Sequence, residues 1–300
     1  MLPAFFLQAI EKQYGAETAA RVTDGMAGPR RVSLRANRLK TDAESMAALL
    51  DAQGIKAQRL PWSEDAFLLP EAAEADLWKL PAYEQGEIYL QSLSSMLPPL
   101  ALAPLPGADI LDMAAAPGGK TAQMAAMTGN RANITACEIN KIRAEKLQFN
   151  LRRQGATRVN VMVRDARKLE DFFRFDQILL DAPCSGSGTM LAGDAATCRA
   201  FSEKLVRNSA AVQLQLLRKA LSLLKPGGSM VYSTCSILEA ENEAVLRAAL
   251  RGAKAGLIPV DFPGLETVPR LPCGLPEAVC VCPTAEYEGF FMAKIRKSAG

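Results

Sequence analysis

The chain has 300 residues, of which 49% are hydrophobic and 22% charged, and its formal net charge is +3. This is the composition of a globular protein, and its longest apolar stretches, such as residues 96–105, contain prolines and are shorter than the roughly 20 residues of a membrane span. The seven cysteines follow no disulfide framework and the N-terminus lacks a secretory signal pattern, so we expect reduced thiols in a cytoplasmic protein without a membrane partner.

Residues 1–85 are predicted to form a small α+β domain. Its pattern is an amphipathic start containing Phe5, Phe6 and Ile10, a strand-like run at 32–39, a helix at 44–54 and a short strand near 67–69. Basic residues gather at positions 30–40 and again at 141–168. Such clusters suit a phosphate backbone, and a solvated helix face is the alternative for each.

Residues 86–300 show regular alternation of strands and helices. Apolar strand-like runs that end in polar turns occur at residues 108–115, 133–139, 158–166, 175–183 and 228–236. This alternation predicts a doubly wound, mostly parallel α/β sheet with right-handed crossovers. A helix is expected to end at residues 225–228, where Gly227 and Gly228 suit a C-cap and turn. The last strand, at 288–297, is predicted to run antiparallel near an edge.

A loop rich in small residues follows the first strand of this sheet, at residues 112–121 (DMAAAPGGKT). Such a loop lets backbone N–H groups approach a ligand at a helix start. Gly119-Lys120-Thr121 resembles the end of a P-loop, but Ala114 stands where that motif needs its first glycine, so an NTPase is excluded. The predicted cofactor contacts in this loop are Ala114, Ala115, Ala116, Pro117, Gly118, Gly119 and Lys120.

Carboxylates close the second and third strands of the predicted sheet. Glu138 is placed to accept hydrogen bonds from ribose hydroxyls, and Asp165 to contact an adenine amino group. Either residue alone is as readily explained as a helix N-cap. Together on successive strand ends they favour an adenosine-type cofactor. NAD is the competing choice, and the first loop lacks its G-x-G-x-x-G spacing.

Two cysteines follow the last two parallel strands, Cys184 in DAPCSGSG and Cys235 in YSTCS. A lone cysteine is usually an inert small hydrophobe, but two on neighbouring strand ends favour covalent catalysis. A thiolate that adds to C6 of cytosine makes C5 nucleophilic, and a second thiol can assist release of the adduct. Asp181 is placed to contact the N3/N4 edge of the ring, and Lys120 either lowers a thiol pKa or packs against solvent. No histidine is available for these steps.

These motifs, in this order and over about residues 30–297, resemble those of the Sun/Fmu-type RNA cytosine-5 methyltransferases, with the bacterial rRNA enzymes of the RsmF type most similar. The resemblance implies a Rossmann-like class I methyltransferase domain, S-adenosylmethionine as cofactor and RNA as partner. We also expect a monomer. It implies cofactor contacts at residues 114–120, Glu138, Asp165 and Asp181. It also assigns the nucleophile to Cys235 and product release to Cys184, an order that the residues alone leave open.

The N-terminal part resembles the RNA-recognition-like module of that family, and Arg35 and Asn37 match its Arg-x-Asn element. The chain departs from the family in two places. Residues 190–194 replace a usual Arg-Lys pair, and residues 281–283 replace an arginine-proline element. Both changes remove cations near the expected RNA path. The resemblance to the rRNA enzymes predicts rRNA as the substrate, with tRNA as the alternative.

Two other classes of function compete with this hypothesis. A protein or small-molecule methyltransferase would need neither thiol, and its Asn-Pro-Pro-aromatic turn is replaced here by residues 181–184. A catalytically inactive RNA-binding or assembly factor is the other class, and it is favoured only by the absence of cations at residues 190–194 and 281–283. We expect no metal site at Cys273, Cys280 and Cys282, because C-x-C is not a zinc knuckle. Cys137 and Cys198 are interpreted as structural, and residues 241–243 as the acidic start of a helix. Four aromatic residues either stack on bases or pack between the domains: Trp62, Trp78, Tyr83 and Tyr89.

Overall fold

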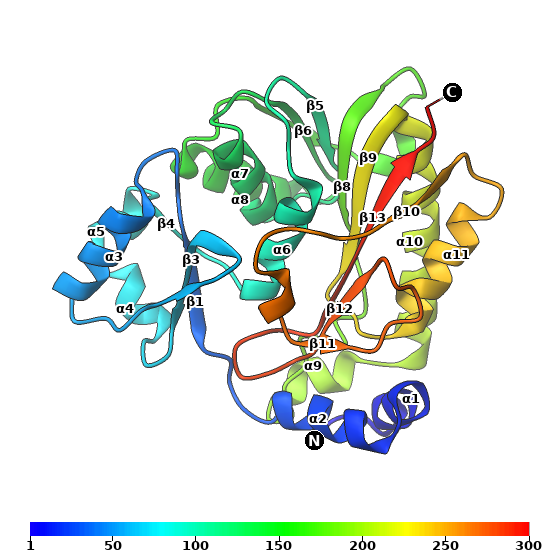
Figure 1. The fold of residues 1–300 in the computed structure, drawn as a ribbon, viewed down its shortest axis with the longest axis horizontal. Helices are drawn as coiled ribbons and strands as arrows, with labels where there is room; N and C mark the ends of the chain where they lie inside the picture. The colour runs from blue at the N-terminus through cyan, green and yellow to red at the C-terminus, as the bar shows by residue number, and fades with distance from the viewer. Residues whose placement is uncertain (300) are drawn as a thin grey trace.

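The computed structural model describes residues 1–299 and contains two β-sheets, which lie side by side in Figure 1. A four-stranded antiparallel sheet has the order β2-β3-β1-β4, and a nine-stranded sheet has the order β11-β12-β13-β9-β8-β5-β6-β7, with β10 also paired to β13. No helix among these residues is long and apolar enough to span a membrane.

The small sheet and its helices form the α+β unit that the sequence predicts. Phe67 and Leu69 of the central β3 and Leu34 of β1 pack against Met46 and Leu50 of the covering helix. Asp42 caps that helix by accepting a hydrogen bond from Ser45 N. The elements are β1 (Val32–Ala36), α3 (Ala43–Ala52), β2 (Gln58–Leu60), β3 (Ser63–Leu69), α4 (Glu74–Trp78), α5 (Pro81–Glu84) and β4 (Ile88–Leu90).

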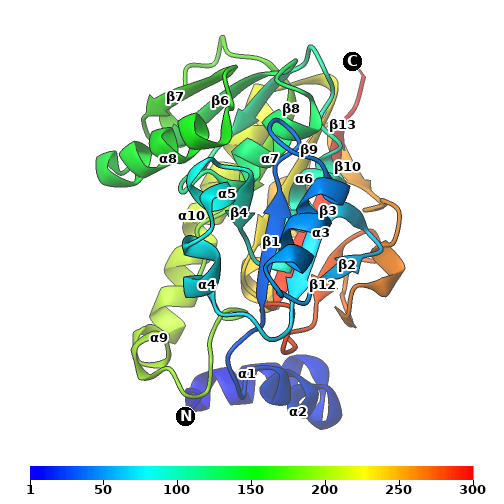
Figure 2. The same ribbon diagram turned by 90° about the vertical axis from the view of Figure 1, so that its left-hand side faces the viewer.

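The two N-terminal helices, α1 (Ala4–Tyr14) and α2 (Ala16–Gly25), pack with the large sheet and not with the small one. Phe6, Ile10 and Val22 are fully buried in the same apolar cluster as the helices that cover one face of the large sheet. The Tyr14 hydroxyl also donates to Ile237 O at 2.5 Å. Figure 2 shows both helices below the small sheet. The domain boundary near residue 85 stays a prediction.

Five neighbouring strands form the parallel part of the large sheet, as predicted. They are β5 (Asp109–Asp112), β6 (Asn133–Glu138), β7 (Val159–Val163), β8 (Phe175–Asp181) and β9 (Leu224–Thr234), paired in parallel along the order β9-β8-β5-β6-β7. Because successive parallel strands run in one direction, their carboxyl ends meet at one edge, where the loops predicted to carry the chemistry begin.

The final strand, β13 (Phe290–Lys297), pairs antiparallel with β9, which confirms the predicted direction. It is covered on its other side by β10 (Ala255–Ile258) and β12 (Val279–Val281), and β11 (Arg270–Leu271) pairs with β12. Phe291 of β13 faces one core cluster of the large sheet, whereas Phe290 and Met292 face the other, as strand alternation requires.

Helices cover both faces of the large sheet. α6 (Leu93–Leu102) and α7 (Gly119–Met127) contribute to one core cluster, and α10 (Glu203–Leu223) and α11 (Glu243–Leu250) contribute to the other. The remaining helical elements are α8 (Lys141–Gln154), α9 (Ala195–Ala200), η1 (Ala166–Lys168), η2 (Glu239–Glu241) and η3 (Leu265–Thr267).

The expectation that Gly227 and Gly228 end a helix is wrong. α10 already ends at Leu223, with Leu224 as its C-cap, and both glycines lie inside β9. Pairing between β8 and β9 is irregular between Phe175 and Gln177. Gly227 has a φ of 76°, and a Cβ on Gly228 would lie 2.7 Å from Asp176 O. The two glycines therefore allow the backbone conformation and the close approach of β8 that this irregular pairing requires.

Buried polar side chains join the small sheet to the large domain. Asn37 Nδ2 donates to Gly86 O at 2.8 Å and to Gln154 O, at the end of α8, at 2.7 Å. Arg35 is only 3% exposed, and its Nε donates to Gln91 Oε1 at 3.2 Å. The Arg-x-Asn element is thus buried between the two sheets, where it holds the domains together.

Candidate active site

The carboxyl ends of β5, β8 and β9 border a cavity of about 490 Å³, a size that suits a nucleoside ligand. Residues of the small sheet, among them Ser33 and Tyr89, form part of its wall. Eight residues of the predicted site line this cavity: Ala114, Ala115, Ala116, Pro117, Gly119, Lys120, Asp181 and Cys235.

The loop before α7 is held by hydrogen bonds to neighbouring elements. Ala115 N donates to Cys137 O at 2.9 Å, and Asn150 Nδ2 of α8 donates to Pro117 O at 2.8 Å. Gly118 has a φ of 108°, which favours glycine, and a Cβ there would lie 2.9 Å from Leu147 Cδ1. A Cβ on Gly119 would lie 2.8 Å from the Tyr89 ring. The two glycines thus allow close packing of the protein, which places the small alanines at the cavity.

Glu138 and Asp165 close β6 and the segment after β7, as predicted, but neither is among the residues that line the cavity. Glu138 is 3% exposed; its Oε1 accepts from Asn140 N at 2.9 Å and its Oε2 pairs with Arg143 at 3.3 Å. Asp165 caps η1 through Arg167 N and forms an ion pair with the Arg167 guanidinium at 2.8 Å. Asp165 is thus a local N-cap, whereas Glu138 binds Asn140, the N-cap of the next helix. The roles of both carboxylates in cofactor binding stay predictions.

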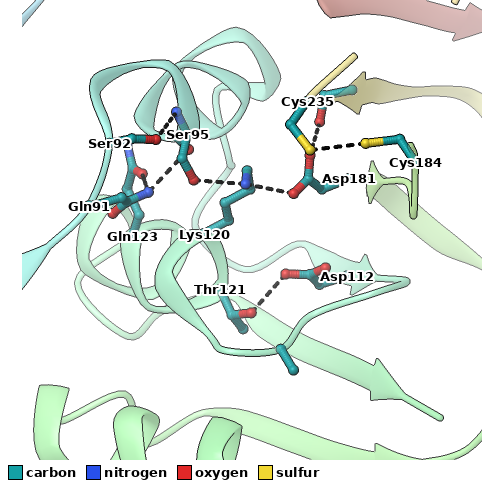
Figure 3. A network of polar contacts seen from close by, with 12 residues as sticks. Gln91, Ser92, Ser95, Asp112, Lys120, Thr121, Gln123, Asp181, Cys184 and Cys235 are labelled. Carbon is teal, nitrogen blue, oxygen red and sulfur yellow. Dashed lines mark hydrogen bonds and ion pairs between the residues drawn. The ribbon is translucent and has the colours of Figure 1, made fainter. Parts of the chain in front are cut away.

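Asp112, the last residue of β5, is a buried carboxylate at the cavity. It is 1% exposed, and its Oδ2 accepts from Thr121 Oγ1 at 2.7 Å (Figure 3). Burial raises the pKa of Asp112 to about 6, the Thr121 hydrogen bond opposes this rise, and the charge of Asp181 adds to it. A fraction of this carboxyl group is therefore protonated near neutral pH.

Lys120 points into the site and not to solvent, so the solvent-packing alternative is wrong. Its Nζ donates to Asp181 Oδ2 at 2.6 Å and to Ser95 Oγ at 2.8 Å, as Figure 3 shows. Burial of Lys120 disfavours its charge, but Asp181 outweighs burial and holds the pKa of Lys120 above its ordinary value. The other Asp181 oxygen accepts from Ser233 Oγ at 2.8 Å. The result is a fixed ammonium–carboxylate pair beside the thiols.

The two predicted cysteines meet at the ends of β8 and β9. Cys184 Sγ and Cys235 Sγ are 2.9 Å apart, and Figure 3 shows the pair beside Asp181. Cys235 lines the cavity, whereas Cys184 is not among its lining residues. The hydrogen bond with Cys235, burial and the charge of Glu241 raise the pKa of Cys184 well above the ordinary value. Cys184 is therefore held as a thiol at neutral pH, while Cys235 faces the cavity.

Glu241 belongs to this site, although its sequence context indicates only the acidic start of a helix. The structure shows that its carboxylate accepts from Ser185, next to Cys184, and from Ser236, next to Cys235. It makes no cap hydrogen bond to its own short helix. The signal in the sequence that could have indicated this role is a serine directly after each cysteine, with an acidic residue, Glu241, shortly after the second serine.

Arg30 brings a guanidinium to the loop after Cys184, where residues 190–194 lack cations. Its Nη2 donates to Gly188 O at 3.0 Å, and its Nε donates to Tyr287 O at 3.2 Å. Arg30 and Arg31 both line the cavity. The basic segment at residues 30–40 therefore supplies positive charge at the rim of the site.

The other five cysteines lie away from this pair. Cys137 is buried in β6 and Cys198 in α9, in agreement with structural roles. Cys280 contacts the Tyr14 hydroxyl at 3.6 Å, and Cys273 donates to Glu243 Oε1 at 3.4 Å. Within residues 1–299, no three His, Cys, Asp or Glu side chains form a group that holds a metal ion. Trp62 packs between the domains, donating to the Tyr287 hydroxyl at 2.8 Å.

Comparison with known proteins agrees with this arrangement. A family model described as 16S rRNA methyltransferase RsmB/F matches residues 99–296, and one described as an RsmF/B-like ferredoxin-like domain matches residues 2–76. The ribosomal RNA small subunit methyltransferase F of Shewanella loihica is 38% identical over 289 residues, covering 91% of this chain and 58% of its own length. The chain thus spans a little over half the length of such relatives.

Solved structures show the same fold. A methyltransferase homologue from Pyrococcus horikoshii is 32% identical, with a TM-score of 0.82 over 99% of this chain and 100% of its own. NSun6 from the same organism has a TM-score of 0.86 over 98% of each chain at 23% identity, a likeness in fold. With the match over residues 99–296, these comparisons show that the chain belongs to the RsmB/F family of 16S rRNA methyltransferases.

Proposed function

We propose that this chain transfers a methyl group from S-adenosylmethionine to C5 of a cytosine in rRNA, through a covalent bond between Cys235 Sγ and C6 of the base. The observation that carries this proposal is the thiol pair at 2.9 Å, one member of which faces a nucleoside-sized cavity beside the Lys120–Asp181 ion pair. Membership of a methyltransferase family supports it.

The cavity fits S-adenosylmethionine in size and in the chemistry of its wall. The small side chains of residues 114–117 leave room along the loop, and Asp112 and Asp181 supply carboxylates at the strand ends. Glu138 and Asp165 are the proposed partners of ribose and adenine, after rearrangement of their present hydrogen bonds. When bound, S-adenosylmethionine supplies an electrophilic methyl group.

Cys235 is the proposed nucleophile because it lines the cavity and lies close enough to Lys120 to contribute to the raised pKa of that lysine. The thiolate is the form of cysteine that attacks carbon. Addition of that thiolate to C6 moves electrons toward N3 and makes C5 nucleophilic. We place Asp181 at the N3/N4 edge of the base, where its carboxylate can relay a proton to N3 from the Lys120 ammonium, 2.6 Å away.

Cys184 is the proposed release residue. After methylation the C5 proton leaves to a base, its bonding electrons form the C5–C6 double bond, and the Cys235 thiolate is expelled. Cys184 lies against the Cys235 sulfur, so it is placed to assist this elimination. Because its pKa is raised, it does not compete with Cys235 as the attacking thiolate.

The test is incubation of cellular RNA and labelled S-adenosylmethionine with the wild-type protein and two variants. We expect Cys184→Ala to accumulate a covalent RNA–protein adduct and Cys235→Ala to give neither adduct nor 5-methylcytosine. Methylation by Cys235→Ala would show that the nucleophile is wrongly assigned. Cys198→Ala, at a buried cysteine outside the site, is the matched control and should behave as wild type. Sequencing of the labelled RNA separates rRNA from tRNA as substrate.

A further inference from the structure

Glu241 is a carboxylate buried at the junction of the two cysteine loops. It lies at the end of η2 and is 0% exposed. Its Oε1 accepts from Ser185 N at 2.7 Å and from Gln213 Nε2 at 3.2 Å. Its Oε2 accepts from Ser185 Oγ at 2.5 Å and from Ser236 Oγ at 2.7 Å. One side chain therefore binds the residue that follows each cysteine.

The surroundings of Glu241 do not include an ion pair with any cation of the described chain. Burial of an unpaired carboxylate is costly unless hydrogen bonds replace its water, and here neutral donors surround both oxygens. If Glu241 served only to cap a helix, its side chain would bond to backbone N–H groups of η2 or α11. It makes no such cap hydrogen bond. Three of the four bonds run to Ser185 and Ser236 in the loops after β8 and β9, so their effect falls on those loops.

Other contacts brace the same junction. Gly188 N donates to Cys235 O at 2.9 Å, and Ser187 Oγ contacts Ser236 Oγ at 2.8 Å. Gln213, the third partner of Glu241, also donates to Pro183 O at 2.9 Å, directly before Cys184. Glu241 is the charged group of this network, and its carboxylate bonds to both cysteine loops and to Gln213 of α10.

We propose that Glu241 is a positioning residue that clamps the Cys184 and Cys235 loops together and so sets the separation of the two sulfur atoms. This inference rests on the proposed function for its consequence in catalysis, but the clamp itself is independent of RNA and of S-adenosylmethionine.

The experiment compares wild type with Glu241→Ala, Glu241→Gln and a matched control. The control is Glu239→Gln, on the same short helix, because Glu239 is exposed and pairs only with Arg247 at 2.6 Å. The first readout is the rate at which diamide oxidises Cys184 and Cys235 to a disulfide, measured by mass spectrometry of the linked peptides. The two thiols lose two electrons and two protons, and diamide becomes the hydrazine. The second readout is kcat and KM for RNA methylation.

We expect Glu241→Ala to form the disulfide about tenfold more slowly and to lose about 100-fold in kcat with little change in KM, because a misplacement near 1 Å has effects of this size. Glu241→Gln keeps the volume and some hydrogen bonds, so its rates should lie between those of Glu241→Ala and wild type. Glu239→Gln should match wild type in both readouts.

Normal disulfide formation in folded Glu241→Ala would overturn the clamp, whatever happens to methylation. Slow disulfide formation with wild-type kcat would overturn its role in the reaction. If Glu241→Ala does not fold, as judged by thermal unfolding, Glu241→Gln decides: unchanged disulfide rate and kcat in that variant contradict the proposal. If wild type itself fails to methylate cytosine, the proposed function fails, and the disulfide rates still test the clamp.

Discussion

Replacement of Asp112 by asparagine should stabilise the protein above pH 6 and have no effect near pH 4. Burial shifts the pKa of Asp112 from 3.8 to about 6. Folding therefore favours the protonated carboxyl group, and its contribution to stability is full below about pH 4 and is lost as the pH rises through about 6. Asparagine stays neutral and can still accept the 2.7 Å hydrogen bond from Thr121.

The shift of about two pKa units corresponds to a gain of about 3 kcal/mol in the free energy of unfolding of Asp112→Asn at pH 8. Urea unfolding followed by circular dichroism, at pH 4 and pH 8 and constant ionic strength, measures this gain. Asp51→Asn, at an exposed carboxylate on α3, is the control and should change stability by less than about 0.5 kcal/mol. Equal stability of Asp112→Asn and wild type at pH 8 would refute the reasoning.

Three further outcomes follow from contacts at the site and between the domains. Arg31→Ala should weaken RNA binding and reduce the steepness of log K against log salt concentration by about 0.7, the value for one phosphate contact with a single strand. Filter binding at several salt concentrations measures this slope, and an unchanged slope would contradict the prediction. Asn37→Ala should cost about 2 kcal/mol in urea unfolding, since two buried hydrogen bonds are lost, one of them to α8 of the large domain. Replacement of the exposed Asn160 by alanine is the control and should cost little. Lys120→Met should lower single-turnover methylation about 100-fold while the protein stays folded; wild-type turnover would exclude the lysine from the reaction.

The parallel sheet and the meeting of the two cysteines could be predicted because they depend on local patterns. Strand runs that end in polar turns place Cys184 and Cys235 at one edge whenever the strands are parallel neighbours, and β8 and β9 are. The direction of β13 was equally accessible, because its sequence follows a long irregular connection.

The packing of the N-terminal helices and the role of Glu241 depend on contacts between segments far apart in the sequence. An amphipathic pattern shows that Phe6 and Ile10 are buried, but not which sheet covers them. Glu241 looks like a helix-start acid in sequence, and only the folded loops bring Ser185 and Ser236 to its oxygens. The end of α10 was misplaced because Gly227 suits a helix cap and a strand irregularity equally well.

The central proposal is that Cys235 bonds to the cytosine, and the most direct measurement is identification of the residue that carries the base. The adduct formed by Cys184→Ala with RNA is to be digested with nuclease and protease, and the modified peptide sequenced by mass spectrometry. We expect a cytidine nucleotide attached to Cys235. A nucleotide on any other residue, or no adduct under conditions in which wild type methylates RNA, would contradict the proposal.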